Sequence, residues 1–402
     1  MASSIPRILI IAGSDSGGGA GIQADIKTVT MLGGHAMTAI TALTAQNTLG
    51  VTAVHAVPTD MVLAQMEAVL SDIGADAVKI GMIGSAETAR AVAARLEELD
   101  VPIVFDPVMI ATSGSVLADE ATIGVFDRLL RIATVATPNE PELAALAGMD
   151  IRDGPDRDRA VEEVMDRTGC RALLAKGGHQ LATGPIHEVE DWLFEAGGNE
   201  HRWRDSRIDT PHSHGTGCTL ASALATERGR GASLVEAITT ARLFVRLSMR
   251  EAPGFGAGHG PMGQQNVRLD LPLDGRPMLN HVTLPASDYE ASIAFYRTLG
   301  CEQIVASPPR YARFEVPGGA TLSIEVKQPP DAPSTTEHFF QCRDVDAAVA
   351  RLAAAGIAFD IMPEDRPYRW RVAETRDPHG NRICLYQTGE IRRFPPWRVQ
   401  PS

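Results

Sequence analysis

The feature that most restricts the fold is an alternation of short β-branched segments with helical segments between about residues 7 and 252. The predicted strands are 8–11, 77–83, 103–105, 134–136 and 172–175, and the predicted helices between them are 61–72, 86–99, 140–147 and 159–168. Parallel strands need crossover connections of this kind, so the alternation predicts a largely parallel sheet with helices on both faces. Ligands of such folds bind at the carboxyl ends of the strands.

Two glycine-rich segments fall where such a fold binds its ligand. The first, Gly13 to Gly21, follows the strand 8–11 and precedes a helical run. The second, His214-Gly215-Thr216-Gly217-Cys218, precedes a helical run over 219–227. Glycines at a helix start expose backbone N–H groups, and the helix dipole favours an anion there. Two such loops in one chain predict phosphoryl transfer.

Polar residues that follow other predicted strands would complete a site for phosphate and metal. They are Asp106, Lys176 and the pair Asn139 and Glu142, which stand one helical turn apart. Carboxylate and carboxamide oxygens suit a magnesium–nucleotide complex, and a lysine can meet a phosphate oxygen. Each signal has a structural alternative, because a strand-terminal Asp106 can form a turn and Asn139 with Glu142 can form a capping box. Their joint placement at successive strand ends favours the phosphoryl-transfer interpretation.

Size, charge and cysteine content limit the class of protein. A chain of 402 residues exceeds what one hydrophobic core usually serves, so two domains are expected. The formal net charge of -13 argues against nucleic acid or a membrane surface as partner. Residues 1–11 hold only a short apolar run, too brief for a signal peptide or a membrane span, and the five cysteines include no CxxC pair. A cytoplasmic protein that acts on a small molecule is therefore expected.

A turn-rich stretch over 252–277 divides the chain, because its glycines and prolines fit no regular element. It predicts a first domain over 1–270, a linker over 271–277 and a second domain over 278–402.

The second domain repeats one pattern. In each half a strand opens at a histidine, His281 or His338, a helix follows an aspartate, Asp288 or Asp344, and several strand-like runs come after it. The repeat predicts an α+β domain of paired βαβββ modules.

Six segments of the first domain carry a family resemblance. They are 12–25, 44–48, 79–82, 106–109, 176–179 and 214–218. Together they resemble the hydroxymethylpyrimidine and phosphomethylpyrimidine kinases of thiamine biosynthesis over roughly residues 5–268. The resemblance implies the three-layer α/β ribokinase-like fold and phosphorylation, by ATP with Mg²⁺, of 4-amino-5-hydroxymethyl-2-methylpyrimidine and then of its monophosphate. Kinases of this fold are often dimers, so a homodimer is expected.

The resemblance also implies roles for individual residues. The pyrimidine pocket would be lined by Asp25, Gln46, Met82 and Val108, and ATP with its metal would be held by Lys176, Asn139, Glu142 and Asp106. Gly215, Thr216 and Gly217 with Cys218 would form the anion hole. Cys218 would stand where sugar kinases of this fold place an aspartate base. Because a helix N-terminus lowers a thiol pKa, we expect Cys218 to remove the hydroxymethyl proton in the first phosphorylation.

Two alternatives remain open for the first domain. One is a pyridoxal or related vitamin kinase of the same fold, although Gln46 and the loop 214–218 favour the thiamine pathway. The other is a sensor that binds the pyrimidine without turnover, with the second domain as its effector. An active site that had lost its activity would have no reason to keep Lys176 and Cys218 together with the pair at 139 and 142, so their presence argues against the sensor.

The second domain resembles the vicinal oxygen chelate superfamily, which includes glyoxalases and bleomycin-resistance proteins. The matching residues are His281, the segment 295–300, His338 and the segment 377–381. The resemblance implies a metal site made of His281, Glu325, His338 and Cys384, and the cysteine would favour Zn²⁺. A metal-free binding cup is equally open, and membership of the superfamily specifies no reaction.

Overall fold

The computed structural model describes residues 5–109, 117–177, 188–267, 269, 279–327, 330–388 and 392. Its contacts divide the chain into two units, Met1–Leu269 and Asp270–Ser402. The predicted linker 271–277 lies outside the described residues. Within the described ranges, no helix combines the length and the apolar character that a bilayer span requires.

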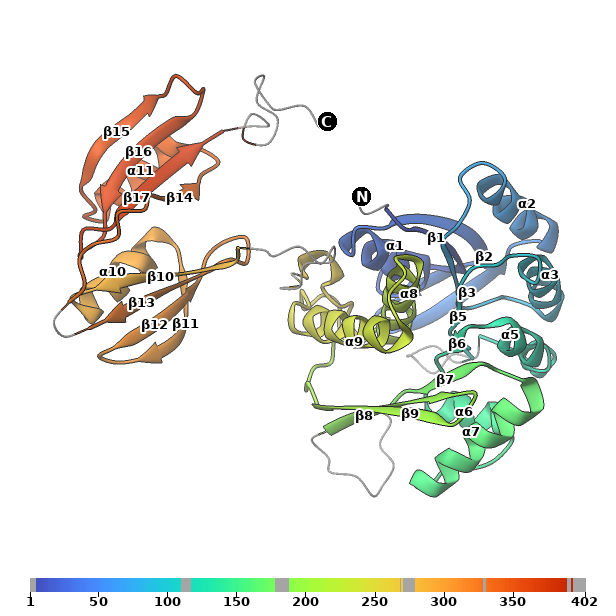
Figure 1. Ribbon diagram of the computed structural model, residues 1–402. Coiled ribbons are helices and arrows are strands. Elements are labelled where there is room, and N and C mark those ends of the chain that lie inside the picture. The colour runs from blue at the N-terminus through green and yellow to red at the C-terminus, as the bar shows by residue number, and fades with distance from the viewer. Residues whose placement is uncertain are drawn as a thin grey trace. The chain divides into compact units, whose positions relative to one another are not determined.

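The described part of the first unit contains a nine-stranded sheet in the order β3-β2-β1-β4-β5-β6-β7-β8-β9 (Figure 1). The strands are β1 (Arg7–Asp15), β2 (His35–Asn47), β3 (Gly50–Ala56), β4 (Ala77–Ile80), β5 (Ile103–Phe105), β6 (Val135–Ala136), β7 (Ala172–Ala175), β8 (Glu188–Glu195) and β9 (Asn199–Ser206). The strands from β2 to β7 in this order pair in parallel, as the alternation predicted. The β2–β3 and β8–β9 hairpins add antiparallel edges that the sequence analysis did not predict.

Helices cover both faces of this sheet (Figure 1). They are α1 (Gly21–Met31), α2 (Thr59–Leu70), α3 (Ala86–Leu96), α4 (Glu120–Ile123), α5 (Phe126–Ile132), α6 (Glu140–Ala147), α7 (Gly154–Thr168), α8 (Thr216–Gly229) and α9 (Leu234–Arg250), with a 3₁₀ turn η1 (Gln264–Asn266). The helices α1, α8 and α9 pack together, as do α2, α3, α5 and α7 on the other side. Because both faces are covered, the apolar run Ile8 to Ile11 in β1 is fully buried.

The second unit contains two four-stranded sheets, in the orders β10-β13-β12-β11 and β14-β17-β16-β15. The first module comprises β10 (His281–Ala286), α10 (Tyr289–Leu299), β11 (Glu302–Ser307), β12 (Tyr311–Glu315) and β13 (Thr321–Val326). The second comprises β14 (His338–Gln341), α11 (Val345–Ala354), β15 (Phe359–Asp365), β16 (Arg371–Arg376) and β17 (Arg382–Gln387). Asp288 and Asp344 accept hydrogen bonds from N–H groups in the first turns of α10 and α11. The predicted pair of βαβββ modules is therefore confirmed.

Candidate active site

A cavity of about 800 Å³ opens at the carboxyl ends of the parallel strands. Both glycine-rich loops contribute to its wall. The predicted site residues that line it are Gln46, Met82, Asp106, Val108, Asn139, Glu142, Lys176 and Gly215 to Cys218. The structure thus brings the loop at the start of α8 into the same cavity as the side chains proposed to hold a pyrimidine.

The start of α8 is open to an anion. Gly215 precedes the helix with a φ of 86°, and a side chain there would collide with the carbonyl group of Gly19 in the other glycine-rich loop. At Gly217 an added Cβ would lie 3.2 Å from the Lys176 Nζ and 3.3 Å from an Asp106 carboxylate oxygen. The first turn of α8 carries no acidic side chain, so its dipole is not opposed. A phosphate can therefore approach these backbone N–H groups with Lys176 close by.

The predicted nucleotide and metal residues form one polar cluster. Asp106 Oδ1 accepts hydrogen bonds from Lys176 Nζ at 2.9 Å and from the Thr137 hydroxyl at 3.0 Å. The Glu142 carboxylate lies 3.9 Å from Lys176 Nζ, and burial raises the pKa of Glu142 to about 7. Asn139 and Glu142 also form the capping box of α6, so the structural and the functional interpretation of this pair coincide.

This cluster suits a magnesium–nucleotide complex. Mg²⁺ binds through one or two carboxylates and completes its shell with water and substrate phosphates, which matches Asp106 and Glu142 beside an open cavity. In the described part of the chain, no three His, Cys, Asp or Glu side chains are grouped to hold an ion by themselves. The described residues by themselves therefore supply only part of a coordination shell.

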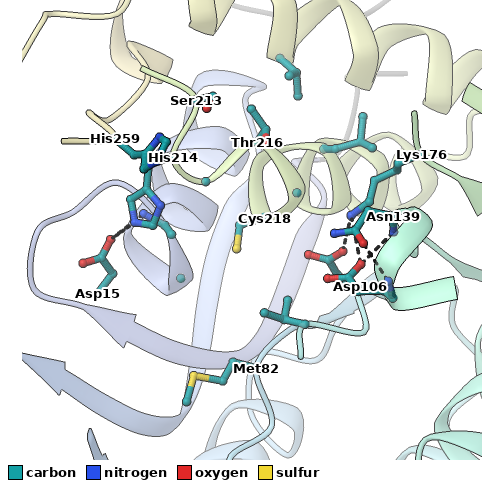
Figure 2. Close-up of a pocket in the computed structure, with 18 of the residues that line it drawn as sticks. Asp15, Met82, Asp106, Asn139, Lys176, Ser213, His214, Thr216, Cys218 and His259 are labelled. Carbon is teal, nitrogen blue, oxygen red and sulfur yellow. Dashed lines mark hydrogen bonds and ion pairs between the residues drawn. The ribbon is translucent and has the colours of Figure 1, made fainter. Parts of the chain in front are cut away.

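Cys218 lies between two polar pairs in Figure 2, with Asp15 and His214 on one side and Asp106 and Lys176 on the other. Burial raises the pKa of the Cys218 thiol to about 11. The positive charge of Lys79 opposes this shift and is too weak to reverse it. The prediction of a lowered thiol pKa is therefore wrong for the ligand-free protein, because desolvation of the thiolate, together with the negative charges of Asp25 and Asp106, outweighs the effect of Lys79.

Asp25 does not line the cavity, which corrects the role inferred from the family resemblance. Its side chain is fully buried and forms an ion pair with Lys79 at 2.8 Å, and it accepts a hydrogen bond from the Ser222 hydroxyl at 2.7 Å. Lys79 is equally buried. Burial by itself would lower the pKa of Lys79, but the charge of Asp25 raises it well above its usual value. A lysine within the otherwise apolar strand β4 is the sequence signal that could have indicated a buried acidic partner.

A second buried network was not predicted. The Asp191 carboxylate accepts a hydrogen bond from the Gly177 N–H group at 2.7 Å and forms an ion pair with Arg242 of α9. Arg242 also contacts Asp205 at 2.7 Å, and burial lowers its pKa to about 10. Because Gly177 follows Lys176 directly, this network fixes the backbone that carries the lysine. Nothing in the sequence marks Asp191, which lies in β8, between β7 and β9, at the cavity wall.

The pyrimidine side of the cavity includes two residues that the resemblance left without a role. His214 Nε2 lies 3.1 Å from Asp15 Oδ2 and 2.9 Å from the carboxamide of Gln46. Burial alone would raise the pKa of Asp15, but hydrogen bonds from His214 and from the N–H groups of Ala20 and Gly17 lower it. Asp15 is therefore a carboxylate at neutral pH.

The metal ligands expected in the second unit do not converge. Parallel pairing of β10 with β13 sets His281 opposite Thr321 and Glu325 opposite Pro285, so His281 and Glu325 are separated by four strand positions, about 13 Å.

The second half gives the same result. His338 pairs with Ile383, so its neighbour Cys384 faces the other side of the sheet. Cys384 packs against Val372 and Tyr386, and burial raises its pKa to about 11. The set His281, Glu325, His338 and Cys384 is therefore wrong as one metal site.

Comparisons with known proteins match both units. A family model described as phosphomethylpyrimidine kinase matches residues 15–263, and one described as the glyoxalase/bleomycin resistance protein/dioxygenase superfamily matches residues 278–385. The hydroxymethylpyrimidine/phosphomethylpyrimidine kinase of Synechococcus elongatus is 47% identical over 261 residues, which cover 65% of this chain and 97% of that protein.

Two solved kinase structures are also similar to this chain. The ADP complex of Bacillus subtilis pyridoxal kinase has a TM-score of 0.59 and 31% identity, covering 65% of this chain and 98% of its own. The phosphomethylpyrimidine kinase from Clostridium difficile has a TM-score of 0.52 and 35% identity, covering 60% of this chain and 98% of its own.

Proposed function

Since the chain belongs to the phosphomethylpyrimidine kinase family, we propose that it transfers phosphate from ATP to 4-amino-5-hydroxymethyl-2-methylpyrimidine and then to the monophosphate. The ribokinase-like fold of the first unit and the glyoxalase-like second unit agree with the sequence-based expectation. The observation that carries the proposal is the shared cavity, which joins the N-terminus of α8 to a pocket lined by Gln46, Met82 and Val108.

In this proposal the protein binds and orients the reactants and stabilises charge. Lys176, Asp106, Glu142 and Asn139 would hold the nucleotide phosphates and their Mg²⁺. When bound, Mg²⁺ neutralises part of the charge on the phosphates. The backbone N–H groups of 215–218 would donate hydrogen bonds to the phosphoryl oxygens, where a preorganised donor acts most strongly on developing charge.

The two phosphorylations differ in their need for a base. The alcohol must lose a proton, and Cys218 Sγ is the proposed acceptor. Only the thiolate can accept this proton, and burial holds the thiol neutral in the ligand-free protein. The role therefore requires that the thiol first lose its own proton to solvent, which added positive charge near Cys218 would favour once the reactants are bound. The monophosphate needs no such step, because its oxygens are already ionised near neutral pH.

A homodimer is part of the proposal. Leu43, Leu49 and Val54 are respectively 47%, 70% and 51% exposed at the β2–β3 hairpin, on an edge of the sheet. An exposed apolar edge of this kind is typical of a surface that pairs with another chain.

The test is to incubate the full chain with Mg²⁺, ATP and the pyrimidine alcohol and to follow the products by ³¹P NMR. The monophosphate is expected first and the diphosphate second, with both rates strongly reduced in Lys176→Ala. Pyridoxal is the comparison substrate, because pyridoxal kinases are among the similar structures. Phosphorylation of pyridoxal alone would favour that alternative, and turnover of neither compound would refute the proposal.

A further inference from the structure

The Gln46 carboxamide lies between two polar side chains on the cavity wall. One end is 2.9 Å from His214 Nε2 and the other is 3.2 Å from Thr44 Oγ1. All three residues line the cavity. A carboxamide has a donor end and an acceptor end, and a half-turn of the end group exchanges their positions. A free glutamine could therefore match either of two hydrogen-bonding edges, and the neighbours decide which one it matches.

On the His214 side, Asp15 determines whether Nε2 of the histidine carries a hydrogen. Its carboxylate accepts hydrogen bonds from the N–H groups of Gly17, Gly19 and Ala20 at 2.8, 3.0 and 2.8 Å. An ionised carboxylate only accepts, so His214 Nε2, 3.1 Å from Asp15 Oδ2, must carry a hydrogen. A protonated Nε2 cannot accept from an amide N–H group. The atom of Gln46 that belongs beside His214 is therefore the oxygen, which shares the single Nε2 hydrogen with Asp15 Oδ2 in a three-centre hydrogen bond.

On the other side, the hydrogen bonds of the Thr44 hydroxyl determine which end of the Gln46 carboxamide faces it. Its hydroxyl has a single hydrogen, and Oγ1 lies 2.9 Å from the carbonyl oxygen of Ser14, which only accepts. The hydrogen is used there, so Thr44 Oγ1 is left to accept from Gln46. The amide nitrogen of Gln46 therefore belongs beside Thr44. The structure has Nε2 toward His214 and Oε1 toward Thr44. Both hydrogen counts favour the half-turned carboxamide, in which these two atoms exchange places.

We infer that His214, held by Asp15, and Thr44 are positioning residues that lock the Gln46 carboxamide in one orientation and so make the pocket select a 4-amino over a 4-oxo pyrimidine. The inference rests on the proposed function, in which this cavity binds a pyrimidine alcohol. An aminopyrimidine edge presents a ring-nitrogen acceptor beside an amino donor, whereas the oxo form presents a ring N–H donor beside a carbonyl acceptor. A locked carboxamide matches one of these orders and opposes the other.

The test compares kcat/KM of the full chain for the 4-amino and 4-oxo forms of 5-hydroxymethyl-2-methylpyrimidine. The wild type should prefer the amino form by on the order of a hundredfold or more, because the wrong edge leaves buried polar groups unpaired. His214→Phe and Thr44→Val should each lower this ratio by about tenfold or more. His214→Gln, which keeps an N–H donor, and Thr44→Ser, which keeps the hydroxyl, are the matched controls and should retain most of the preference.

The outcomes separate this inference from the proposed function. If the wild type phosphorylates the amino form but His214→Phe and Thr44→Val keep the full ratio, the lock is wrong and the kinase function stands. If the wild type phosphorylates neither form, the function itself fails. A second readout does not depend on the folding of a variant: ¹⁵N NMR of histidine-labelled wild type at pH 8 should show His214 with Nε2 protonated, and an unprotonated Nε2 would overturn the inference.

Discussion

The buried ion pair between Lys79 and Asp25 provides a quantitative test of the packing beneath the site. Both side chains have no exposed surface and their charged atoms are 2.8 Å apart. Asp25→Asn removes the negative charge and leaves a buried ammonium without its partner, which costs about 3–5 kcal/mol. For a unit of this size, about 2–4 °C of melting temperature is lost per kcal/mol, so a fall of about 6–20 °C is expected.

The assay is thermal unfolding of the full chain, followed by circular dichroism, in a double-mutant cycle. Adding Lys79→Met to Asp25→Asn should recover much of the loss, because the unpaired charge is gone. Glu67→Gln is the matched control. It breaks an ion pair with Arg95 in which the Glu67 side chain is 59% exposed, and it should cost about 1 kcal/mol or less. The reasoning is refuted if Asp25→Asn is no more harmful than Glu67→Gln, or if the double variant is less stable than both single variants.

Three further predictions concern single residues. Cys218→Ser should slow phosphorylation of the alcohol more than that of the monophosphate, since only the alcohol loses a hydroxyl proton, and equal losses in the two separately measured rates would contradict the base role. Burial raises the pKa of Glu142 from 4.5 to about 7, so the stability gained from its protonated form is complete below pH 4.5 and lost as the pH rises toward 7. The melting temperature of Glu142→Gln should therefore rise relative to wild type between pH 5 and pH 8, and a fall over that range would show that the carboxylate is favoured in the fold. Because the expected ligands do not converge, His338→Ala should leave the metal content of the purified full chain unchanged, and loss of one metal ion per chain would reinstate the predicted site.

The sequence predicted features that depend on local pattern. Alternating strands and helices gave the parallel sheet because each crossover is a local unit, and aspartates before apolar runs located helix starts such as that of α10. The glycine-rich loops and strand ends converged on one cavity because parallel strands share a carboxyl edge.

Features that depend on long-range packing could not be predicted from the sequence. The Asp25–Lys79 pair joins residues 54 positions apart, and no local pattern shows that the carboxylate turns away from the cavity. The thiol pKa of Cys218 follows from desolvation of the thiolate and from charges that are distant in the sequence, such as Asp25 and Asp106, whereas the sequence shows only the helix start. In the second unit, Glu325 lies 44 positions after His281 and Cys384 lies 46 after His338, and this similar spacing does not show the strand register that separates the four side chains.

The most direct test of the account is a crystal structure of the full chain with the pyrimidine alcohol and a non-hydrolysable ATP analogue. The account predicts the ring against Gln46 and Met82, the terminal phosphate bonded to the N–H groups of 215–218, and the hydroxymethyl oxygen about 3–3.5 Å from the terminal phosphorus. A pyrimidine bound elsewhere, or a terminal phosphate away from the start of α8, would contradict it.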